Sequence, residues 1–426
     1  MNGLRRFLST VRDPKAEWRT IIGLEIHAQL ATAQKLFSPA LNDSDSPANN
    51  NVDPLDAANP GSLPVLNWDC VALAVRAALL LNCTVQRESA FDRKHYQYAD
   101  LPAGYQITQH RHPIAREGRL EIPGGGNTTV SIRQIQLEQD SAKTLHYSQA
   151  GIDSDRSSSG GSSIDLNRCG VGLIEIVTDP VLTSAEDALA FAKGVWQLLV
   201  DGGVCRGILA QGHMRFDANV SVTGPRAPAD APPLGVRVEI KNVNTFQGLR
   251  RAIAAEAQRQ ISLLEAGHGV QRETRSYDEQ RRTTVATREK EQTVDYRMIP
   301  EFDVPSLILD EVFIEAVRTT MPETRPARYN RLWLAYSLEA SQVDVLLSQP
   351  GLLGLFEELV AAIGGSKDSS RSIYNFLVNK YLGELRKRRI PWEESPISVS
   401  SLVRIIRSLI EGSLDSMITM QRTCSI

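Results

Sequence analysis

Cysteine is scarce in this chain, and its spacing excludes two common kinds of site. The 426 residues contain five cysteines: Cys70, Cys83, Cys169, Cys205 and Cys424. Their number is odd and none forms a C-x-x-C pair, so the sequence predicts neither a disulfide framework nor a structural zinc site. We therefore expect the chain to work in a reducing compartment.

Three further absences narrow the class of protein. No apolar run is long enough to span a bilayer, so we expect no membrane insertion. The phosphate-loop pattern G-x-x-x-x-G-K-[ST] is absent, so the chain has no self-sufficient nucleotide loop of that kind. The net charge of −3 excludes a globally basic nucleic-acid binder, although a local basic patch would be hidden in that sum.

The first residues form a segment of their own. Apolar residues recur at helical spacing from Leu4 to Val11, arginines lie among them, and no acidic residue appears before Asp13. Such a leader is typical of an organelle transit peptide, and a frayed terminus is the alternative. We assign residues 1–18 to this leader. The expected location is the mitochondrial matrix, or otherwise the cytoplasm.

The clearest pattern that is present lies in Ile22–Leu30, where apolar residues alternate strictly with polar ones. Successive side chains of a strand point to opposite faces, so we expect a half-buried strand with Glu25 and His27 side by side. A carboxylate and an imidazole at this spacing can share a metal ion or a proton. Taken alone, the strand is better explained by a solvated polar face.

Four further segments repeat this alternation: Gln134–Asp140, Leu173–Val177, Met214–Val222 and Val236–Lys241. Clean alternation marks an antiparallel sheet with one covered face. If the strands share one sheet, six polar side chains converge on one concave surface: Glu25, His27, Glu138, Glu175, Asp217 and Glu239. Converging carboxylates repel unless a cation or a proton relieves them, so the repetition favours a functional face.

Helix signals divide the rest of the chain. Thr183–Glu186 is a capping box that predicts a helix to about Val200, and Thr245 begins another helix. Beyond Pro326 the periodicity is only helical. We therefore expect an α+β domain over residues 19–320 and an all-α module over residues 321–412.

The expected helical module carries a basic cluster near a helix end. It consists of Lys380 and the run Arg386–Arg389. A solvated helix terminus explains the cluster as well as contact with a phosphate backbone does.

The motifs taken together resemble one family, and they do so in order along the chain. They are Gly23–His27, Pro60–Asn67, Phe91–Lys94, Leu101–Ile107, Leu137–Asp140, Asp165–Arg168, Leu173–Val177, Arg215–Ser221, Glu239–Asn244 and Asp295–Arg297. The sequence resembles the B subunit of the aspartyl/glutamyl-tRNA(Asn/Gln) amidotransferase, colinearly from about Thr20 to Ile410.

The resemblance implies a ligase that forms C–N bonds with glutamine as nitrogen donor. It implies that the B subunit uses ATP and Mg²⁺ to phosphorylate the side chain of glutamate misloaded on glutamine tRNA. An A subunit would hydrolyse glutamine and supply ammonia, and a small C-type subunit would brace the pair. The implied fold is an α+β cradle domain around an antiparallel sheet with flanking helices, then a helical domain and a tRNA-holding tail domain.

The resemblance also implies the site residues. The catalytic and metal-binding positions fall on Glu25, His27, Glu138 and Glu175. Three of the four are carboxylates, which a hard cation prefers, and phosphoryl transfer needs such a cation to neutralise charge.

Four other side chains are candidates on chemical grounds for contacts to phosphate or carboxylate groups of ATP and substrate. They are Lys94, Arg215, Asn219 and Lys241. Each of them is explained equally well as a structural pair within the sheet.

The last residues depart from the family pattern. Residues 413–426 do not resemble the start of the tail domain, and we interpret them as a truncated remnant of it. Two hypotheses follow: a catalytic subunit that is active with its partners, and a truncated, non-catalytic assembly or tRNA-binding subunit of the same complex. A free-standing metal-dependent phosphotransferase is disfavoured because no nucleotide loop is visible.

Overall fold

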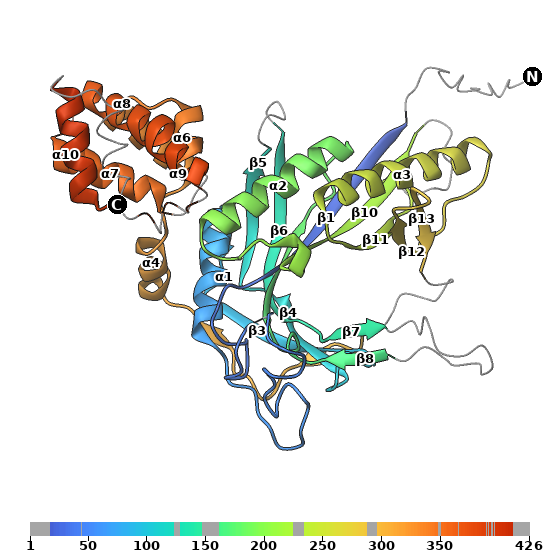
Figure 1. The fold of residues 1–426 in the computed structure, drawn as a ribbon. Coiled ribbons are helices and arrows are strands. Elements are labelled where there is room, and N and C mark those ends of the chain that lie inside the picture. The colour runs from blue at the N-terminus through green and yellow to red at the C-terminus, as the bar shows by residue number, and fades with distance from the viewer. Residues whose placement is uncertain are drawn as a thin grey trace, which may run out of the picture. The chain divides into compact units, whose positions relative to one another are not determined.

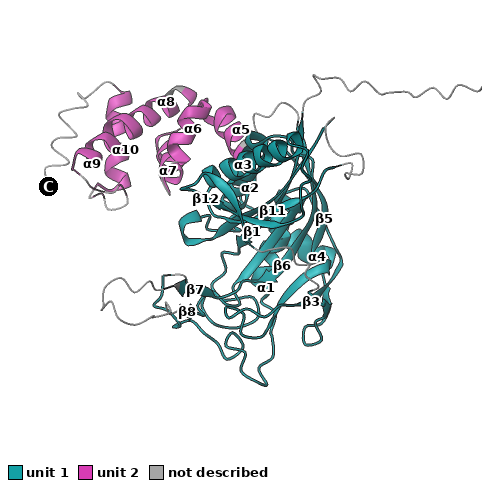
Figure 2. Ribbon diagram, turned by 90° about the vertical axis from the view of Figure 1, so that its right-hand side faces the viewer, with its two compact units in different colours: residues 1–322 teal, residues 323–426 magenta. Residues whose placement is uncertain are grey.

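The computed structural model describes residues 18–43, 45–122, 128–146, 162–224, 234–287, 296–347, 351–364, 366–388, 390, 392, 395 and 397–411. The expected leader, apart from Trp18, and the expected tail remnant lie outside these residues. The chain divides into two compact units, residues 1–322 and 323–426 (Figure 2). The sequence predicts this boundary at about residue 320.

A mixed sheet of thirteen strands, counted over the described residues, forms the centre of the first unit (Figure 1). Its main path runs in the order β13 (Thr283–Ala286), β12 (Thr274–Asp278), β11 (Val238–Val243), β10 (Met214–Thr223), β1 (Arg19–Gln29), β9 (Gly172–Thr178), β6 (Thr129–Gln139), β4 (Tyr105–His112), β3 (Glu88–His95) and β14 (Ile299–Pro300). Off this path lie β2 (Thr84–Val85), β5 (Ala115–Glu121) and β15 (Leu307–Ile308), and β7 (Lys143–His146) pairs separately with β8 (Ser162–Asp165).

The five strands predicted from alternation are consecutive neighbours in this sheet, in the order β11, β10, β1, β9, β6. All four pairings among them are antiparallel, which confirms the expected architecture. One pairing elsewhere differs, because β11 and β12 run parallel. The reason is the helix α3 (Phe246–Glu265) between them, since parallel neighbours need a crossover connection.

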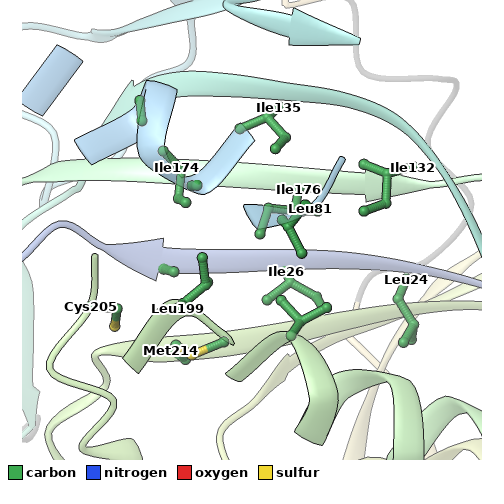
Figure 3. Close-up of a cluster of buried hydrophobic side chains, with 14 of the residues drawn as sticks. Leu24, Ile26, Leu81, Ile132, Ile135, Ile174, Ile176, Leu199, Cys205 and Met214 are labelled. Carbon is green, nitrogen blue, oxygen red and sulfur yellow. The ribbon is translucent and has the colours of Figure 1, made fainter. Parts of the chain in front are cut away.

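Alternation along β1 separates an apolar face from a polar one. Ile22, Leu24, Ile26 and Ala28 are almost completely buried. They share one core with side chains of α1 (Trp68–Leu80), α2 (Ala185–Asp201) and α3, part of which is drawn in Figure 3. Each fully buried isoleucine or leucine contributes roughly 1.5–3 kcal/mol, so this face fixes the sheet and leaves the opposite face for polar groups.

The N-caps of α2 and α3 can be compared with the capping residues predicted from the sequence. Thr245 caps α3 as predicted, and its Oγ1 accepts a hydrogen bond from Gly248 N at 3.0 Å. The predicted cap of α2 was wrong by one residue. Ser184 is the cap, and its Oγ accepts from Asp187 N at 3.0 Å. An acid follows three positions after either candidate, so the capping box fits the sequence in two registers.

The remaining helix of the first unit is α4 (Glu311–Thr319), and a short 3₁₀ turn covers Leu209–Gln211. The described part of the second unit holds only helices: α5 (Arg325–Tyr336), α6 (Ala340–Leu347), α7 (Leu352–Ile363), α8 (Lys367–Asn375), a π-helix at Phe376–Tyr381, α9 (Leu382–Arg388) and α10 (Val399–Ile410). These helices enclose a separate core around Phe356 and Leu359.

Part of the basic cluster of the second unit is paired within its own helix. Lys387 and Arg388 lie 3.4 and 3.2 Å from the carboxylate of Glu384, and Arg389 falls outside the described residues.

None of the described helices is, by itself, long and apolar enough to cross a membrane; α6 and α7 meet that length and composition only as a pair, which is bent by 113°.

The buried thiols give a first testable consequence. Burial raises the pKa of Cys70, Cys83 and Cys169 to about 12 and that of Cys205 to about 11. A raised pKa keeps the thiol protonated at pH 8, and only the thiolate is reactive. We expect iodoacetamide at pH 8 to leave these four residues unmodified in the folded chain and to alkylate them in guanidinium chloride. Peptide mass spectrometry checks this, and equal labelling in both states would contradict the burial.

Candidate functional site

Three side chains meet on the polar face of the sheet, at its centre. His27, Glu138 and Glu175 each offer a ligand atom, and the three atoms lie within 4.8 Å of one another. Strand register explains the meeting. His27 lies opposite Glu175 across β1 and β9, and Glu138 on β6 lies opposite Leu173, two residues before Glu175.

Two buried atoms of this group have no hydrogen-bond partner among the described residues. They are Nδ1 of His27 and Oε2 of Glu138. A buried polar atom without a partner costs about 1–3 kcal/mol, so such atoms mark a place that a ligand can complete. The other ring nitrogen of His27, Nε2, lies 3.8 Å from Oδ2 of Asp217. Metal-bound histidines commonly face a carboxylate in this way through the nitrogen that does not bind the metal.

The charges of this group are balanced in part by bound protons. Burial, and next the carboxylate of Glu138, raise the pKa of Glu175 to about 7. Burial alone would lower the pKa of His27, but Asp217, Glu175 and Glu138 outweigh it and raise that pKa to about 9. The group therefore holds protons at neutral pH to limit its negative charge. Metal binding releases protons from its ligands, so a divalent cation would take their place.

Lys94 on β3 supplies positive charge from the protein. Burial by itself would lower the pKa of Lys94, but Glu138 and Glu175 outweigh it and raise that pKa. Its Nζ lies 5.0 Å from the ring centroid of Tyr296 and 6.0 Å from that of Tyr96. The ammonium group of Lys94 is thus charged at neutral pH and lies near both the acids and two aromatic rings.

Glu25 belongs to a second acidic group, together with Asp217 and Glu239. It lies opposite Asp217 across β1 and β10, and its ligand atoms lie within 4.8 Å of those of Asp217 and Glu239. The sequence predicts a single set of Glu25, His27, Glu138 and Glu175. In the structure Glu25 groups with Asp217 and Glu239, and His27 lies between this group and the first, since its Nε2 is 3.8 Å from Asp217.

The second acidic group is largely neutralised within the protein. Lys241 Nζ lies 3.1 Å from Glu239 Oε1 and 3.9 Å from Asp217 Oδ2. Asn219 Nδ2 donates to Glu25 Oε1 at 3.0 Å. The first group, with its two unpartnered atoms, is therefore the better candidate for a metal ion.

Arg215 has a partner that the sequence did not reveal. Its guanidinium donates to both oxygens of Asp140, with N···O distances of 2.9 and 3.2 Å. Asp140 is only 2% exposed, and Gln29 Nε2 donates to it at 2.9 Å. Burial would raise the pKa of Asp140, but Arg215 and Arg168 outweigh it and lower that pKa. These contacts match the alternative of a structural pair, which joins β10 to the end of β6.

Sequence reasoning also missed two glutamines that bind the acids directly. Gln106 Nε2 donates to Glu138 Oε1 at 2.6 Å, and Gln136 Nε2 donates to Glu175 Oε2 at 2.7 Å. Gln136 stands at a polar position of an alternating strand, which was the available signal. Gln106 lies in the motif Leu101–Ile107, to which the sequence assigned no site residue, and its role depends on how β4 and β6 meet.

Comparisons with known proteins decide the family. A family model described as the GatB/GatE catalytic domain matches residues 20–315. A protein of Methylobacterium sp. (strain 4-46), named as the B subunit of an aspartyl/glutamyl-tRNA(Asn/Gln) amidotransferase, is 38% identical over 410 residues, which are 96% of this chain and 80% of that protein. The chain belongs to the GatB family.

Other members of the GatB family give the same result. The protein of the same name from Anaeromyxobacter sp. (strain Fw109-5) is 38% identical over 92% of this chain and 79% of its own length. That of Rhodopseudomonas palustris (strain BisB18) is 37% identical over 96% and 81%. These matches confirm the family that the sequence motifs predicted. Its members are subunits of an amidotransferase, a ligase of protein biosynthesis. The GatB match includes every candidate site residue, from Glu25 to Lys241.

Arg215 provides a test of the anchoring role. Removing one partner of a buried ion pair leaves the other charge uncompensated and costs about 3–5 kcal/mol. We expect Arg215→Gln to lower the free energy of unfolding by about 3 kcal/mol, measured by urea denaturation followed by circular dichroism.

Lys241→Gln is the matched control, because Lys241 pairs on the same face but its side chain is 40% exposed. We expect it to cost less than about 1 kcal/mol. Equal stability of Arg215→Gln and the unaltered chain would contradict the anchoring role of Arg215.

Proposed function

We propose that this chain is the activating and amidating subunit of a glutamyl-tRNA(Gln) amidotransferase. It would phosphorylate the side-chain carboxylate of glutamate carried by tRNA(Gln), with ATP as donor. Membership in the GatB family supports this proposal. The structural observation that carries it is the meeting of His27, Glu138 and Glu175 with two unpartnered atoms among them.

The proposed reaction has two steps. In the first, an oxygen of the substrate carboxylate attacks the γ-phosphorus of ATP, and the bond from that phosphorus to the leaving ADP breaks. In the second, the nitrogen of ammonia attacks the carbonyl carbon, loses a proton, and displaces inorganic phosphate. The products are Gln-tRNA(Gln), ADP and phosphate.

The first acidic group fits a magnesium ion. The two carboxylates would supply oxygen ligands, which Mg²⁺ prefers, and the imidazole of His27, whose Nε2 lies 3.8 Å from Asp217, would supply a third ligand. When bound, Mg²⁺ would neutralise charge on the phosphates. The imidazole also suits Mn²⁺, which makes that ion a useful probe of the site.

Other polar side chains of this face would hold the reactants. Lys94 is half-buried and charged beside the metal ligands, so we propose that it contacts the phosphoryl group in transfer. Asn219, whose Oδ1 has no partner among the described residues, and Lys241, which is partly exposed, would contact ATP or the substrate carboxylate. Arg215 would act by holding the site together, since its guanidinium is bound to Asp140.

The proposal includes partners and a location. Ammonia would come from an A subunit that hydrolyses glutamine, and a small C-type subunit would complete the complex. The leader of residues 1–18, in which no acidic residue precedes Asp13, supports a mitochondrial location.

One assay tests the proposed function as a whole. The chain is purified with its two partner subunits, and ATP-dependent amidation of Glu-tRNA(Gln) is followed by separating glutamine from glutamate after deacylation. We expect amide formation that requires ATP and a divalent cation. A correctly assembled complex that forms no amide would overturn the proposal and favour the non-catalytic assembly or tRNA-binding subunit.

A single substitution tests the role of Glu138. In Glu138→Gln a neutral amide replaces a charged metal ligand, so ATP-dependent activation of the carboxylate should be lost. Hydrolysis of glutamine by the partner subunit should remain measurable. Phosphate release that depends on Glu-tRNA(Gln) is the readout, and Glu121→Gln, at an exposed position of β5, is the control. Phosphate release retained in Glu138→Gln would show that Glu138 is not a metal ligand.

A further inference from the structure

We propose that Gln106 and Gln136 are positioning residues, which fix the carboxylates of Glu138 and Glu175 so that both can hold one divalent cation. This inference rests on the metal site of the proposed function. It adds to that function two uncharged side chains that touch neither substrate nor the cation.

The amide of Gln106 can face Glu138 in only one way. Gln106 is 5% exposed, and its Nε2 donates to Glu138 Oε1 at 2.6 Å and to the carbonyl oxygen of Gln139 at 2.5 Å. Both neighbours are acceptors, so the NH₂ end must face them. The hydroxyl of Tyr96 donates to Gln106 Oε1 at 3.4 Å and occupies the other end.

The amide of Gln136 is fixed in the same manner beside Glu175. Gln136 is 2% exposed and lies directly opposite Glu175 in the register of β6 and β9. Its Nε2 donates to Glu175 Oε2 at 2.7 Å and to Thr108 Oγ1 at 3.2 Å. Its Oε1 accepts from Gln134 Nε2 at 2.5 Å, so both ends of the amide are occupied.

Each glutamine therefore binds one oxygen of one carboxylate and leaves the other oxygen available. Oε2 of Glu138 has no partner among the described residues, as expected for a ligand atom that is held ready. Without these donors, Glu138 and Glu175 would turn apart, because two neighbouring carboxylates repel each other. Loss of such an outer contact in metal sites typically costs 10–100-fold in metal affinity.

A purely structural role is the alternative for Gln106. Strands β4 and β6 share a single backbone pairing, Thr108 with Glu138, and glutamine side chains supply further bonds between them. Gln139 Oε1 accepts from Ile107 N, and Gln109 Oε1 accepts from Leu137 N, both at 3.1 Å.

Gln109 provides the matched control for this alternative. Like Gln106, it is buried on β4 and bonds to the strand β6. Its Nε2, however, donates to Ser89 Oγ and not to an acid. Gln109→Met therefore removes a strand bridge without touching a metal ligand.

The test measures binding of Mn²⁺ alone by electron paramagnetic resonance, in the complex with partner subunits and without ATP or tRNA. We expect Gln106→Met and Gln136→Met each to raise the dissociation constant roughly 10–100-fold. Gln109→Met should lower the melting temperature while keeping the dissociation constant within about twofold of the unaltered complex. Gln106→Asn and Gln136→Asn, whose shorter amides cannot reach the acids, should reproduce the loss if a Met variant fails to fold.

The outcomes separate this inference from the proposed function. Unchanged Mn²⁺ affinity in the Gln106 and Gln136 variants, with binding in the unaltered complex, would overturn the positioning role alone. An equal loss in Gln109→Met would also overturn it, because the effect would then follow from strand bridging. Failure of the unaltered complex to bind Mn²⁺ would overturn the metal site on which both proposals depend.

Discussion

The pairing of β1 with β9 and β10 is the constraint on which the rest of this structure depends. The antiparallel register places His27 opposite Glu175 on one side and Glu25 opposite Asp217 on the other. A slip of one residue would move every polar side chain of β1 into the core and every apolar one out. Burial of Ile22, Leu24 and Ile26 excludes that slip, so the core and the polar face are specified by the same hydrogen bonds.

Placing so many acids on one face creates an electrostatic problem that the chain resolves unevenly. Asp140 is bound by Arg215, and Glu239 is bound by Lys241. The group of His27, Glu138 and Glu175 has instead the nearby charge of Lys94 and two atoms without partners among the described residues. Asp140 and Glu239 therefore have dedicated basic partners, and the incompletely balanced group is the one suited to bind a further ligand.

The sequence was sufficient for the five central strands, for the face that they build and for the family. A period of two is visible in four of these strands, β9 shows a single acid among apolar residues, and the motifs that carry the resemblance to the GatB family need no structure. The parallel strand β12 was not foreseen because nothing in Thr274–Asp278 shows where α3 returns the chain.

The grouping of the side chains could not be predicted from sequence. Glu25 and His27 are two residues apart on one strand, yet Glu25 groups with Asp217 and Glu239 from β10 and β11, whereas His27 groups with Glu138 and Glu175 from β6 and β9. Arg215 carries the guanidinium group expected of a phosphate contact, and only the position of Asp140 at the end of β6 shows what it binds. Local pattern gives the face on which a side chain lies, whereas its neighbours depend on strand order.

The single backbone pairing between β4 and β6 has one more consequence. Lys94 belongs to the part of the sheet on the β4 side, and Glu138, Glu175 and His27 belong to the part on the β6 side. Beside that one pairing, the side chains of Gln106, Gln109 and Gln139 make the hydrogen bonds that connect these two parts. The two parts of the polar face are thus connected largely by uncharged amide groups at the position where their charges meet.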